Sequence, residues 1–127
     1  GKEVTMFFTF WGLSVIKRSD KVRAKKDIMG RIFGMMLPHD SRKLSLSKMN
    51  FAGAGPAMMK GRMAAKKIAQ LETMIADALR AGVKMTACQM SMDIMGVTRE
   101  ELIDGVEIGG VASYLDSSDS SNLNLFV

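Results

Sequence analysis

The chain has 127 residues and a net charge of +5, with 47% of its residues hydrophobic and 24% charged. This composition is typical of one globular domain spanning residues 1–127, and it excludes disordered, collagenous and disulfide-rich classes. One Cys and one His exclude an intrachain disulfide and a structural zinc site, which takes several such ligands.

The charge is divided between the two halves of the chain. Residues 1–70 carry 15 Lys and Arg against 4 Asp and Glu, and residues 71–127 carry 3 against 9, so the halves have net charges of +11 and −6. A basic half can attract an anionic partner. We expect no nucleic-acid partner, because the basic half lacks an RNA-binding aromatic pattern and aromatic residues form only 6% of the chain.

No membrane span is predicted. The longest uncharged apolar run, residues 6–16, is well short of the roughly 20 residues that a membrane helix needs. Without a recognisable secretory signal, the expected location is the cytoplasm. The chain begins with Gly rather than Met, which leads us to expect that its natural start lies upstream.

The first half of the chain contains one clear element. Residues 3–10, EVTMFFTF, are nearly continuous in apolarity, which predicts a strand covered on both faces that ends at Trp11 and Gly12. Residues 17–31 are charged with scattered apolar positions, which suits a short helix or a mobile segment. Residues 32–56 contain several Gly, Pro and Asn breaks and are predicted to form a long irregular excursion, possible in a compact domain only if it is functional, mobile or an oligomer contact.

The middle of the chain predicts a helix followed by a strand. Over residues 57–81, apolar side chains recur at steps of three and four residues, which indicates one long amphipathic helix. Gly82 follows as a C-cap, and residues 83–88 are predicted to form a second strand. This order is typical of a parallel α/β crossover.

The last third continues the alternation of helices and strands. Thr98 and Glu101 have the spacing of a capping box, which predicts a short helix up to Asp104. The further predicted elements are a strand at 106–108, a helix at 111–115, a surface turn at 116–121 and a terminal strand at 122–127. Together these elements predict an α/β fold with a mostly parallel sheet.

Cys88 is the main candidate for chemistry. It ends the predicted strand at 83–88, and open parallel sheets place their ligand crevices at the carboxyl ends of their strands. If residues 89–96 form a helix, its free N–H groups and positive dipole end would favour the reactive thiolate form of Cys88. The alternative is that Cys88 is a small buried hydrophobe without a chemical role.

The 13 Met residues offer a metal-binding alternative. On a strand, Cys88, Met90 and Met92 would present three soft sulfur ligands on one face, which suits Cu(I). On a helix the three side chains diverge, and Met more often fills gaps in a core or an oligomer contact.

Two further motifs carry weaker signals. The segment AGAGPA at 52–57 is similar to the glycine turn of a dinucleotide-binding fold, but Met58 replaces its third Gly. A flexible loop with no bound cofactor is therefore favoured. His39 lies in a polar stretch and would pair with Cys88 only if the fold brought the two together.

Four segments together resemble a known family. They are EVTMFFTFWGL at 3–13, the basic excursion, ALRAGVKMTAC at 78–88 and ACQMSMDIMGV at 87–97, of which the last is the strongest part. Over nearly its whole length the chain resembles the DsrE/DsrF-like sulfur-relay family, in the branch labelled DsrE-like or peroxiredoxin family.

The resemblance implies a small three-layer α/β sandwich with a mostly parallel sheet, in which the family's N-terminal β-α unit is missing before Gly1. It also implies a homo-oligomer that carries sulfane sulfur as a persulfide on Cys88 and needs no metal. Its partners would be sulfur donor and acceptor proteins or small sulfane-sulfur compounds. Beside Cys88, we name Trp11, Gly12 and Gln89 as candidate substrate-binding residues. A two-cysteine peroxidase is not expected, because the chain holds no second Cys to resolve the first.

Three functional hypotheses therefore follow from the sequence. The leading one is a cytoplasmic sulfur carrier or sulfurtransferase that uses Cys88. Its rival is a non-catalytic oligomeric binding or scaffold module in which Cys88 is structural. The third is a Cu(I)-binding protein that uses Cys88, Met90 and Met92.

Overall fold

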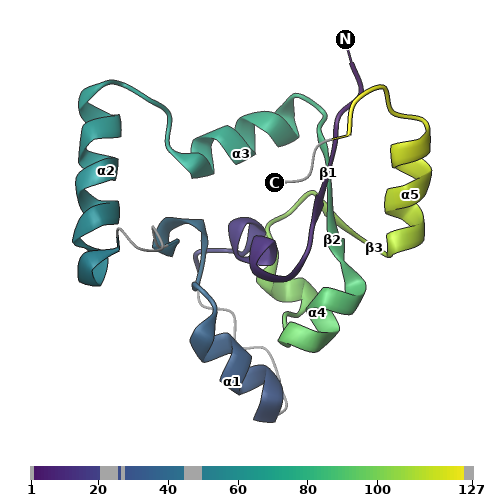
Figure 1. Ribbon diagram of the computed structural model, residues 1–127, viewed down its shortest axis with the longest axis horizontal. Coiled ribbons are helices and arrows are strands. Elements are labelled where there is room, and N and C mark those ends of the chain that lie inside the picture. The colour runs from purple at the N-terminus through teal and green to yellow at the C-terminus, as the bar shows by residue number, and fades with distance from the viewer. Residues whose placement is uncertain (1, 21–25, 27, 45–49, 125–127) are drawn as a thin grey trace.

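A three-stranded parallel sheet organises the part of the chain that the computed structural model describes, which is residues 2–20, 26, 28–44 and 50–124. Its strands are β1 (Thr5–Phe8), β2 (Lys84–Cys88) and β3 (Val106–Gly109), in the order β1-β2-β3. The register pairs Phe8 with Ala87 and Cys88 with Gly109. The carboxyl ends of the strands therefore meet at one edge of the sheet (Figure 1), and the predicted parallel sheet is confirmed.

Helices lie on both sides of the sheet. Helix α5 (Val111–Asp119) lies on one side, and helix α3 (Leu71–Arg80) and the 3₁₀ helix η1 (Phe10–Ile16) lie on the other (Figure 1). This arrangement confirms the predicted α/β sandwich. The other helices of the described ranges are α1 (Ile28–Met36), α2 (Ala54–Ala65), α4 (Gln89–Met95) and the single 3₁₀ turns η2 (Ser41–Lys43), η4 (Phe51–Gly53) and η5 (Arg99–Glu101).

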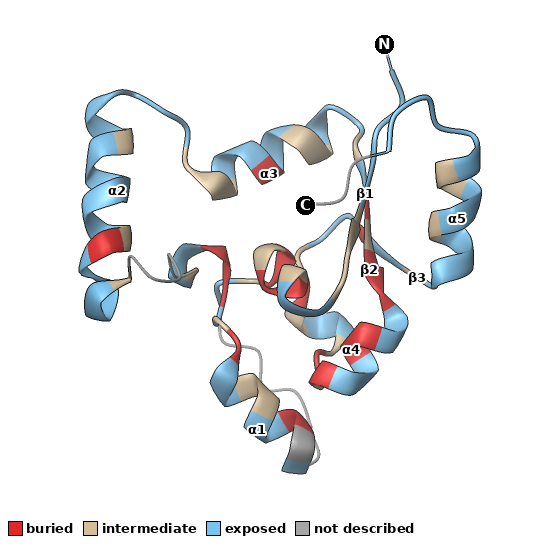
Figure 2. Cartoon of the chain, in the orientation of Figure 1, coloured by how far each residue is buried: buried red, intermediate tan, exposed pale blue. Residues whose placement is uncertain are grey.

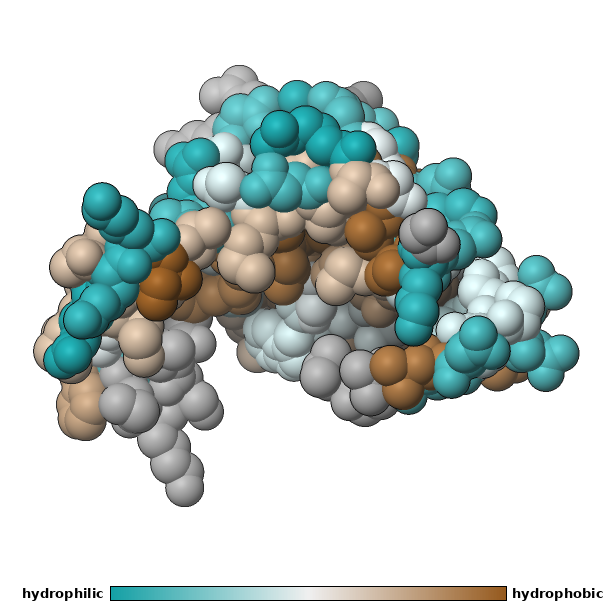
Figure 3. Space-filling model, turned by 90° about the horizontal axis from the view of Figure 1, so that it is seen from above, coloured by the Kyte–Doolittle hydropathy of each residue, from teal (hydrophilic) through white to brown (hydrophobic). Residues whose placement is uncertain are grey.

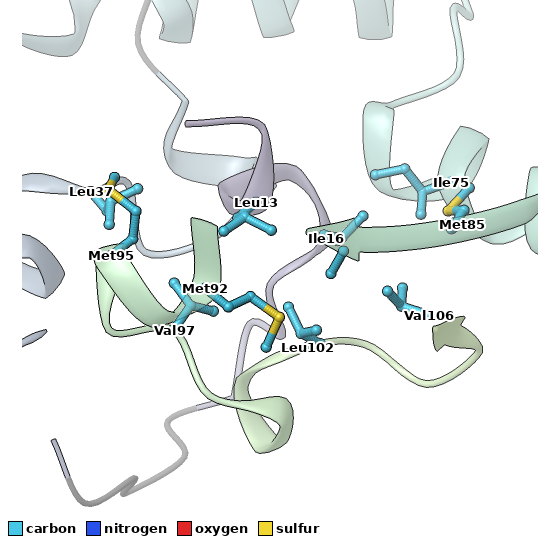
Figure 4. Close-up of a cluster of buried hydrophobic side chains, with 11 residues drawn as sticks. Leu13, Ile16, Leu37, Ile75, Met85, Met92, Met95, Val97, Leu102 and Val106 are labelled. Carbon is cyan, nitrogen blue, oxygen red and sulfur yellow. The ribbon is translucent and has the colours of Figure 1, made fainter. Parts of the chain in front are cut away.

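The hydrophobic core lies on one face of β2. Figure 4 shows side chains from η1, α3, β2 and α4 converging there. Figure 2 shows that burial is concentrated in β2, η1 and α4, whereas α2 and α5 are largely exposed. The buried cluster consists of Leu13, Ile16, Leu37, Ile75, Met85, Ala87, Met92, Met95, Val97, Leu102 and Val106.

The first strand lies at the edge of the sheet, and the prediction that both of its faces are covered is wrong. In the described part of the chain, β1 pairs with β2 and no other strand, and its Thr5 and Met6 are exposed. Phe8 packs against the core, and the ring centroids of Phe7 and Tyr114 in α5 are 5.3 Å apart. The aromatic residues of β1 therefore make a contact on each face without enclosing the strand.

The prediction of one helix over residues 57–81 is also wrong, because this stretch contains both α2 and α3. Lys67 has a left-handed backbone with φ of 55°, and the Ile68 N–H donates to the Met63 carbonyl at 2.9 Å. These features close α2. Periodicity at steps of three and four residues is common to both helices, so it carries no sign of the break between them.

The excursion predicted over residues 32–56 is more helical than expected. Helix α1 extends into it, and η4 and the start of α2 occupy its end. The AGAGPA segment, expected as a loop, turns through Gly53, with φ of 93°, directly into α2. Residues 45–49 of the excursion, and residues 21–25 and 27 of the charged segment before it, lie outside the described residues.

After α3 the structure follows the prediction closely, except that the short helix predicted from Thr98 to Asp104 is only the 3₁₀ turn η5 and that two further corrections apply at the end. Gly82 has φ of 85° after α3, and the predicted strands at β2 and β3 and the helix at α4 are confirmed. Helix α5 runs beyond the predicted 111–115 and includes the start of the expected turn. Residues 122–124 are irregular rather than a strand, because the Asn124 side chain donates to the Ser118 carbonyl at 3.2 Å, and residues 125–127 lie outside the described residues.

Helices α1 and α4 approach each other through two glycines. Gly96 follows α4 with φ of 62°, and a Cβ at this position would overlap the backbone of Gly30 in α1. Gly96 therefore combines a left-handed backbone with a helix contact that leaves no room for a side chain.

We expect Gly96→Ala to lower the free energy of unfolding by about 2–5 kcal/mol. A left-handed residue with a Cβ costs about 1–2 kcal/mol, and the overlap with Gly30 adds an overpacking cost of about 1–3 kcal/mol. Gly61→Ala in α2 is the matched control, because a Cβ there meets nothing within 4 Å and Ala favours a helix by about 0.5–1 kcal/mol. Urea denaturation measures both variants, and equal effects would contradict the close approach of α1 and α4.

Candidate functional site

The carboxyl edge of the sheet is where the candidate chemistry lies. At this edge η1 follows β1, α4 follows β2 and α5 follows β3 (Figure 1). Cys88 is both the last residue of β2 and the N-cap of α4. This confirms the predicted position of Cys88 at a strand-to-helix junction.

The packing of this edge encloses Cys88, which is 1% exposed. Its register partner is Gly109 of β3. A Cβ at Gly109 would lie 2.6 Å from Ser113 Oγ and 2.8 Å from Thr86 Cγ2, so there is no room for a side chain between β2 and the start of α5. A molecule that reacts with Cys88 must therefore wait for a local opening of the edge.

Helix α4 buries one stripe of side chains and exposes the others. Cys88, Ser91, Met92 and Met95 are buried at spacings of three and four residues, whereas Met90 is 54% exposed. The Cu(I) alternative requires Cys88, Met90 and Met92 to alternate on a strand. That alternative is wrong, because residues 89–95 are helical and direct Met90 away from the other two.

Two buried hydroxyl groups close to this junction have no hydrogen-bond partner. Ser91, in the first turn of α4, and Ser14, in η1, are fully buried, and neither Oγ has a partner among the described residues. The two helices pack against each other. Buried hydroxyls are almost always paired, so each of these two can still bond to a group outside the described residues, such as a water molecule or a ligand. No motif in the sequence distinguishes Ser91; its one signal is a spacing of three residues from Cys88, which places the two on one side of a helix.

The candidate substrate-binding residues lie where the chain leaves β1 and β2. Trp11 and Gly12 are in η1, with Trp11 exposed, and Phe10 before them has a left-handed φ of 43° that turns the chain away from β1. Gln89 is the exposed first residue of α4, and its Nε2 donates to Asp93 Oδ1 at 2.8 Å. Since β1 and β2 are neighbours, all three candidates begin the elements at the edge that contains Cys88.

The other two motifs singled out in the sequence are not brought to Cys88. His39 is exposed after α1, and among the described residues no hydrogen bond joins it to Cys88. The AGAGPA segment at 52–57 begins α2, which lies at the opposite side of the molecule from α5 (Figure 1). Neither motif contributes to the edge of the sheet.

A buried ion cluster fixes the end of η1 to η5. The Glu101 carboxylate lies 2.8 Å from Lys26 Nζ and 3.5 Å from Lys17 Nζ, and it accepts the Thr98 N–H at 3.0 Å. The Arg18 N–H donates to the Glu101 carbonyl at 2.8 Å. Burial by itself would raise the pKa of Glu101, but the hydrogen bonds from Lys26 and Thr98 and the charges of Lys17 and Lys26 together lower this pKa below its ordinary value.

Comparison with known sequences identifies the family. The sequence model of the DsrE/DsrF/DrsH-like family matches residues 1–126. The chain belongs to the DsrE/DsrF/DrsH-like family. The resemblance carried by the four sequence segments is thereby confirmed.

Two relatives of this DsrE/DsrF/DrsH-like chain are similar over its whole length. The uncharacterised protein YrkE of Bacillus subtilis (strain 168) is 41% identical over 125 residues, which cover 98% of this chain and 78% of the relative. The sulfur carrier protein DsrE2 of Allochromatium vinosum is 34% identical over 131 residues, which cover 100% of this chain and 80% of the relative.

The same described ranges offer no metal cluster and no membrane-spanning helix. They contain no group of three or more His, Cys, Asp or Glu side chains that could hold a metal ion, and none of their helices has both the length and the apolarity to cross a membrane. A hollow of about 680 Å³ lies along α5, between Leu115 and Asn124, and not at Cys88.

We expect Glu101→Gln to lower the free energy of unfolding by about 1–3 kcal/mol near neutral pH. Lys17 and Lys26, which are 7% and 15% exposed, would lose their anion, and a more deeply buried pair would lose about 3–5 kcal/mol. Because the folded pKa of Glu101 is lowered from 4.5, its stabilisation is present above that value and is lost as pH falls through the folded pKa.

Urea denaturation as a function of pH tests this expectation. The difference between the wild type and Glu101→Gln should shrink in acid, where Glu101 becomes protonated. Glu100→Gln changes the exposed neighbour and serves as the control, with a smaller effect on stability at neutral pH. A difference between wild type and Glu101→Gln that stays constant into acid would contradict the role of the ion cluster.

Proposed function

We propose that this chain is a cytoplasmic sulfur carrier or sulfurtransferase that holds sulfane sulfur as a persulfide on Cys88. The observation that carries the proposal is the similarity of the whole chain to a sulfur carrier protein, in a chain that has one Cys. Within these 127 residues, sulfur carried on a thiol has a single place to reside. The position of Cys88 at the carboxyl edge of a parallel sheet agrees with this role.

The proposed chemistry consists of two exchanges at sulfur. During loading, the Cys88 thiolate attacks the terminal sulfur of a donor persulfide, so a bond forms to Cys88 Sγ while the donor S–S bond breaks and the donor leaves as a thiolate. During unloading, an acceptor thiolate attacks the terminal sulfur and Cys88 leaves as a thiolate. The sulfane sulfur keeps its oxidation state throughout, so no external oxidant, reductant or metal takes part.

The burial of Cys88 has a direct consequence for this cycle. With 1% of the residue exposed, the persulfide is sheltered from peroxide and from bulk thiols, and donor and acceptor react with it during local opening of the edge. We assign Trp11 and Gln89, exposed at the start of η1 and α4, to contact with the donor or acceptor. Gly12 would let the partner approach the backbone of η1.

We also assign Ser91 as a hydrogen-bond donor to the loaded sulfur. Ser91 lies on the same buried stripe of α4 as Cys88, and its Oγ has no hydrogen-bond partner among the described residues. A persulfide adds one sulfur atom beyond Sγ and carries a negative charge when ionised. A hydroxyl donor beside it would stabilise that charge.

The same burial favours a second candidate function. A structural Cys in an oligomeric scaffold is expected to be buried, and Cys88 is 1% exposed. In that case the thiol neither loads sulfur nor reacts with an alkylating agent until the chain unfolds. Thiol chemistry therefore separates the two functions.

Intact-protein mass spectrometry after incubation with polysulfide tests the carrier function. We expect sulfur-sized mass increments on the wild type, their absence on Cys88→Ser, and their discharge by an added thiol. Alkylation of the folded protein is measured in parallel. Absence of both the adduct and alkylation before unfolding would overturn the carrier function and support the scaffold.

Ser91→Ala tests the assigned donor. We expect the unfolding free energy of the thiol form to change by less than about 0.5 kcal/mol, because no hydrogen bond is lost, while the persulfide is discharged about tenfold faster without its donor. Ser117→Ala in α5 is the control. Equal persulfide lifetimes in Ser91→Ala and the wild type, measured by mass spectrometry, would remove Ser91 from the mechanism and leave Cys88 as the carrier.

A further inference from the structure

The two faces of β2 have different surroundings. Met85 and Ala87 belong to the hydrophobic core, which η1 and α3 cover from one side of the sheet (Figure 4). Successive side chains of a strand point to opposite faces. Thr86 and Cys88 therefore belong to the other face of β2, on the side where α5 lies.

The start of α5 approaches this second face closely. A Cβ at Gly109 would be 2.8 Å from Thr86 Cγ2 in β2 and 2.6 Å from Ser113 Oγ in α5. The same Gly109 is the register partner of Cys88. A movement of α5 away from the sheet would therefore uncover the side of β2 to which the thiol belongs.

Helix α5 is held to the sheet by few contacts. None of its residues is buried, and within the described ranges its main contacts are with the adjacent strand β3. Near its start, the ring of Tyr114 lies 5.3 Å from the ring of Phe7 in β1, measured between centroids. The Ser113 hydroxyl donates to the Gly110 carbonyl at 2.7 Å, which is a bond within the first turn and does not attach the helix to the sheet.

The neighbouring helices at this edge are held by the core. Leu13 and Ile16 of η1 and Met92 and Met95 of α4 are buried in it, and moving either helix would expose these side chains to water. Helix α5 contributes no side chain to the core. In Figure 3 the visible surface at the right-hand end, where α5 lies, is mostly hydrophilic or near neutral. Of the three helices, α5 can therefore leave the sheet at the lowest cost.

Two successive glycines join β3 to α5. The strand ends at Gly109, and Gly110 is the N-cap of the helix. Glycine has the widest backbone freedom of all residues, so a pair of glycines allows the following helix to change direction. A Cβ at Gly110 would meet nothing within 4 Å, which leaves space for this movement.

We propose that α5 is a gate over Cys88. The glycine pair 109–110 is its hinge, and the contact between Tyr114 and Phe7 is its latch. In the closed form Cys88 is 1% exposed; when the latch opens, a thiol-reactive molecule reaches Cys88 from the side of α5. Tyr114 acts through the position of α5 and is therefore a positioning residue. The gate concerns access to the thiol and does not depend on the group that the thiol carries.

Alkylation of Cys88 by iodoacetamide in the folded full chain measures how often the gate is open. We expect Tyr114→Ala to be alkylated about tenfold faster than the wild type, because the latch loses its ring contact. Tyr114→Phe keeps the ring and should react at the wild-type rate. Since the opening is local, the difference should persist at urea concentrations far below the unfolding transition.

Leu79→Ala in α3 is the matched control. It truncates a large side chain that packs against the core on the other side of the sheet. This variant should be less stable in urea denaturation, but its folded form should be alkylated at the wild-type rate. Equal rates in the wild type and Tyr114→Ala, an equal acceleration in Leu79→Ala, or a Tyr114→Phe variant as fast as Tyr114→Ala would overturn the gate.

Incubation of the same variants with polysulfide separates the gate from the proposed carrier function. Faster alkylation of Tyr114→Ala, with no sulfur adduct on it or on the wild type, would support the gate and count against the carrier. A sulfur adduct on the wild type, with Tyr114→Ala alkylated no faster, would support the carrier and overturn the gate.

Discussion

Hydrogen bonding of β2 to strands on both of its sides determines where the other elements can lie. Because β1, β2 and β3 are parallel, the chain must return to the opposite end of the sheet before each new strand. Helix α3 therefore precedes β2 at its amino end, and α4 begins at its carboxyl end. Met85 and Ala87 bring the core to one face of the strand. The position of Cys88 follows from this one strand, since β2 ends there.

Local signals were sufficient for this central unit. Gly82 ends α3, and the apolar run of β2 and the helical spacing after Cys88 follow it closely in the sequence. Each of these signals predicts the element that the structure contains. The stretch 57–81 shows where local reasoning stops. The break between α2 and α3 is at Lys67, a residue type without the turn preference of Gly or Pro. The two helices also differ in packing, because α3 contributes side chains to the hydrophobic core and α2 contributes none to it. Whether β1 is an edge strand likewise depends on distant pairing partners, which apolarity alone does not reveal.

The candidate site likewise has a part that local sequence signals predict and a part that they do not. Cys88, Trp11, Gly12 and Gln89 could be placed at one edge because each follows or ends a strand, and parallel strands share an edge. The unpaired hydroxyls of Ser14 and Ser91 depend on how η1 packs against α4. The contact between Lys26 and Glu101 joins residues 75 positions apart. Burial and pairing of this kind arise only when the chain has folded, so sequence patterns contain little of them.

The length of the outer strands has a consequence for how the protein avoids misassembly. In the part of the chain that the structure describes, strands β1 and β3 form the two margins of the sheet and have four residues each. Such short margins present few unpaired N–H and C=O groups, so they are poor templates for a foreign strand. A chain with much exposed apolar surface is thereby protected from growth into extended cross-β aggregates. Much of its exposed apolar surface lies on helices, whose backbone groups are already hydrogen-bonded within the helix.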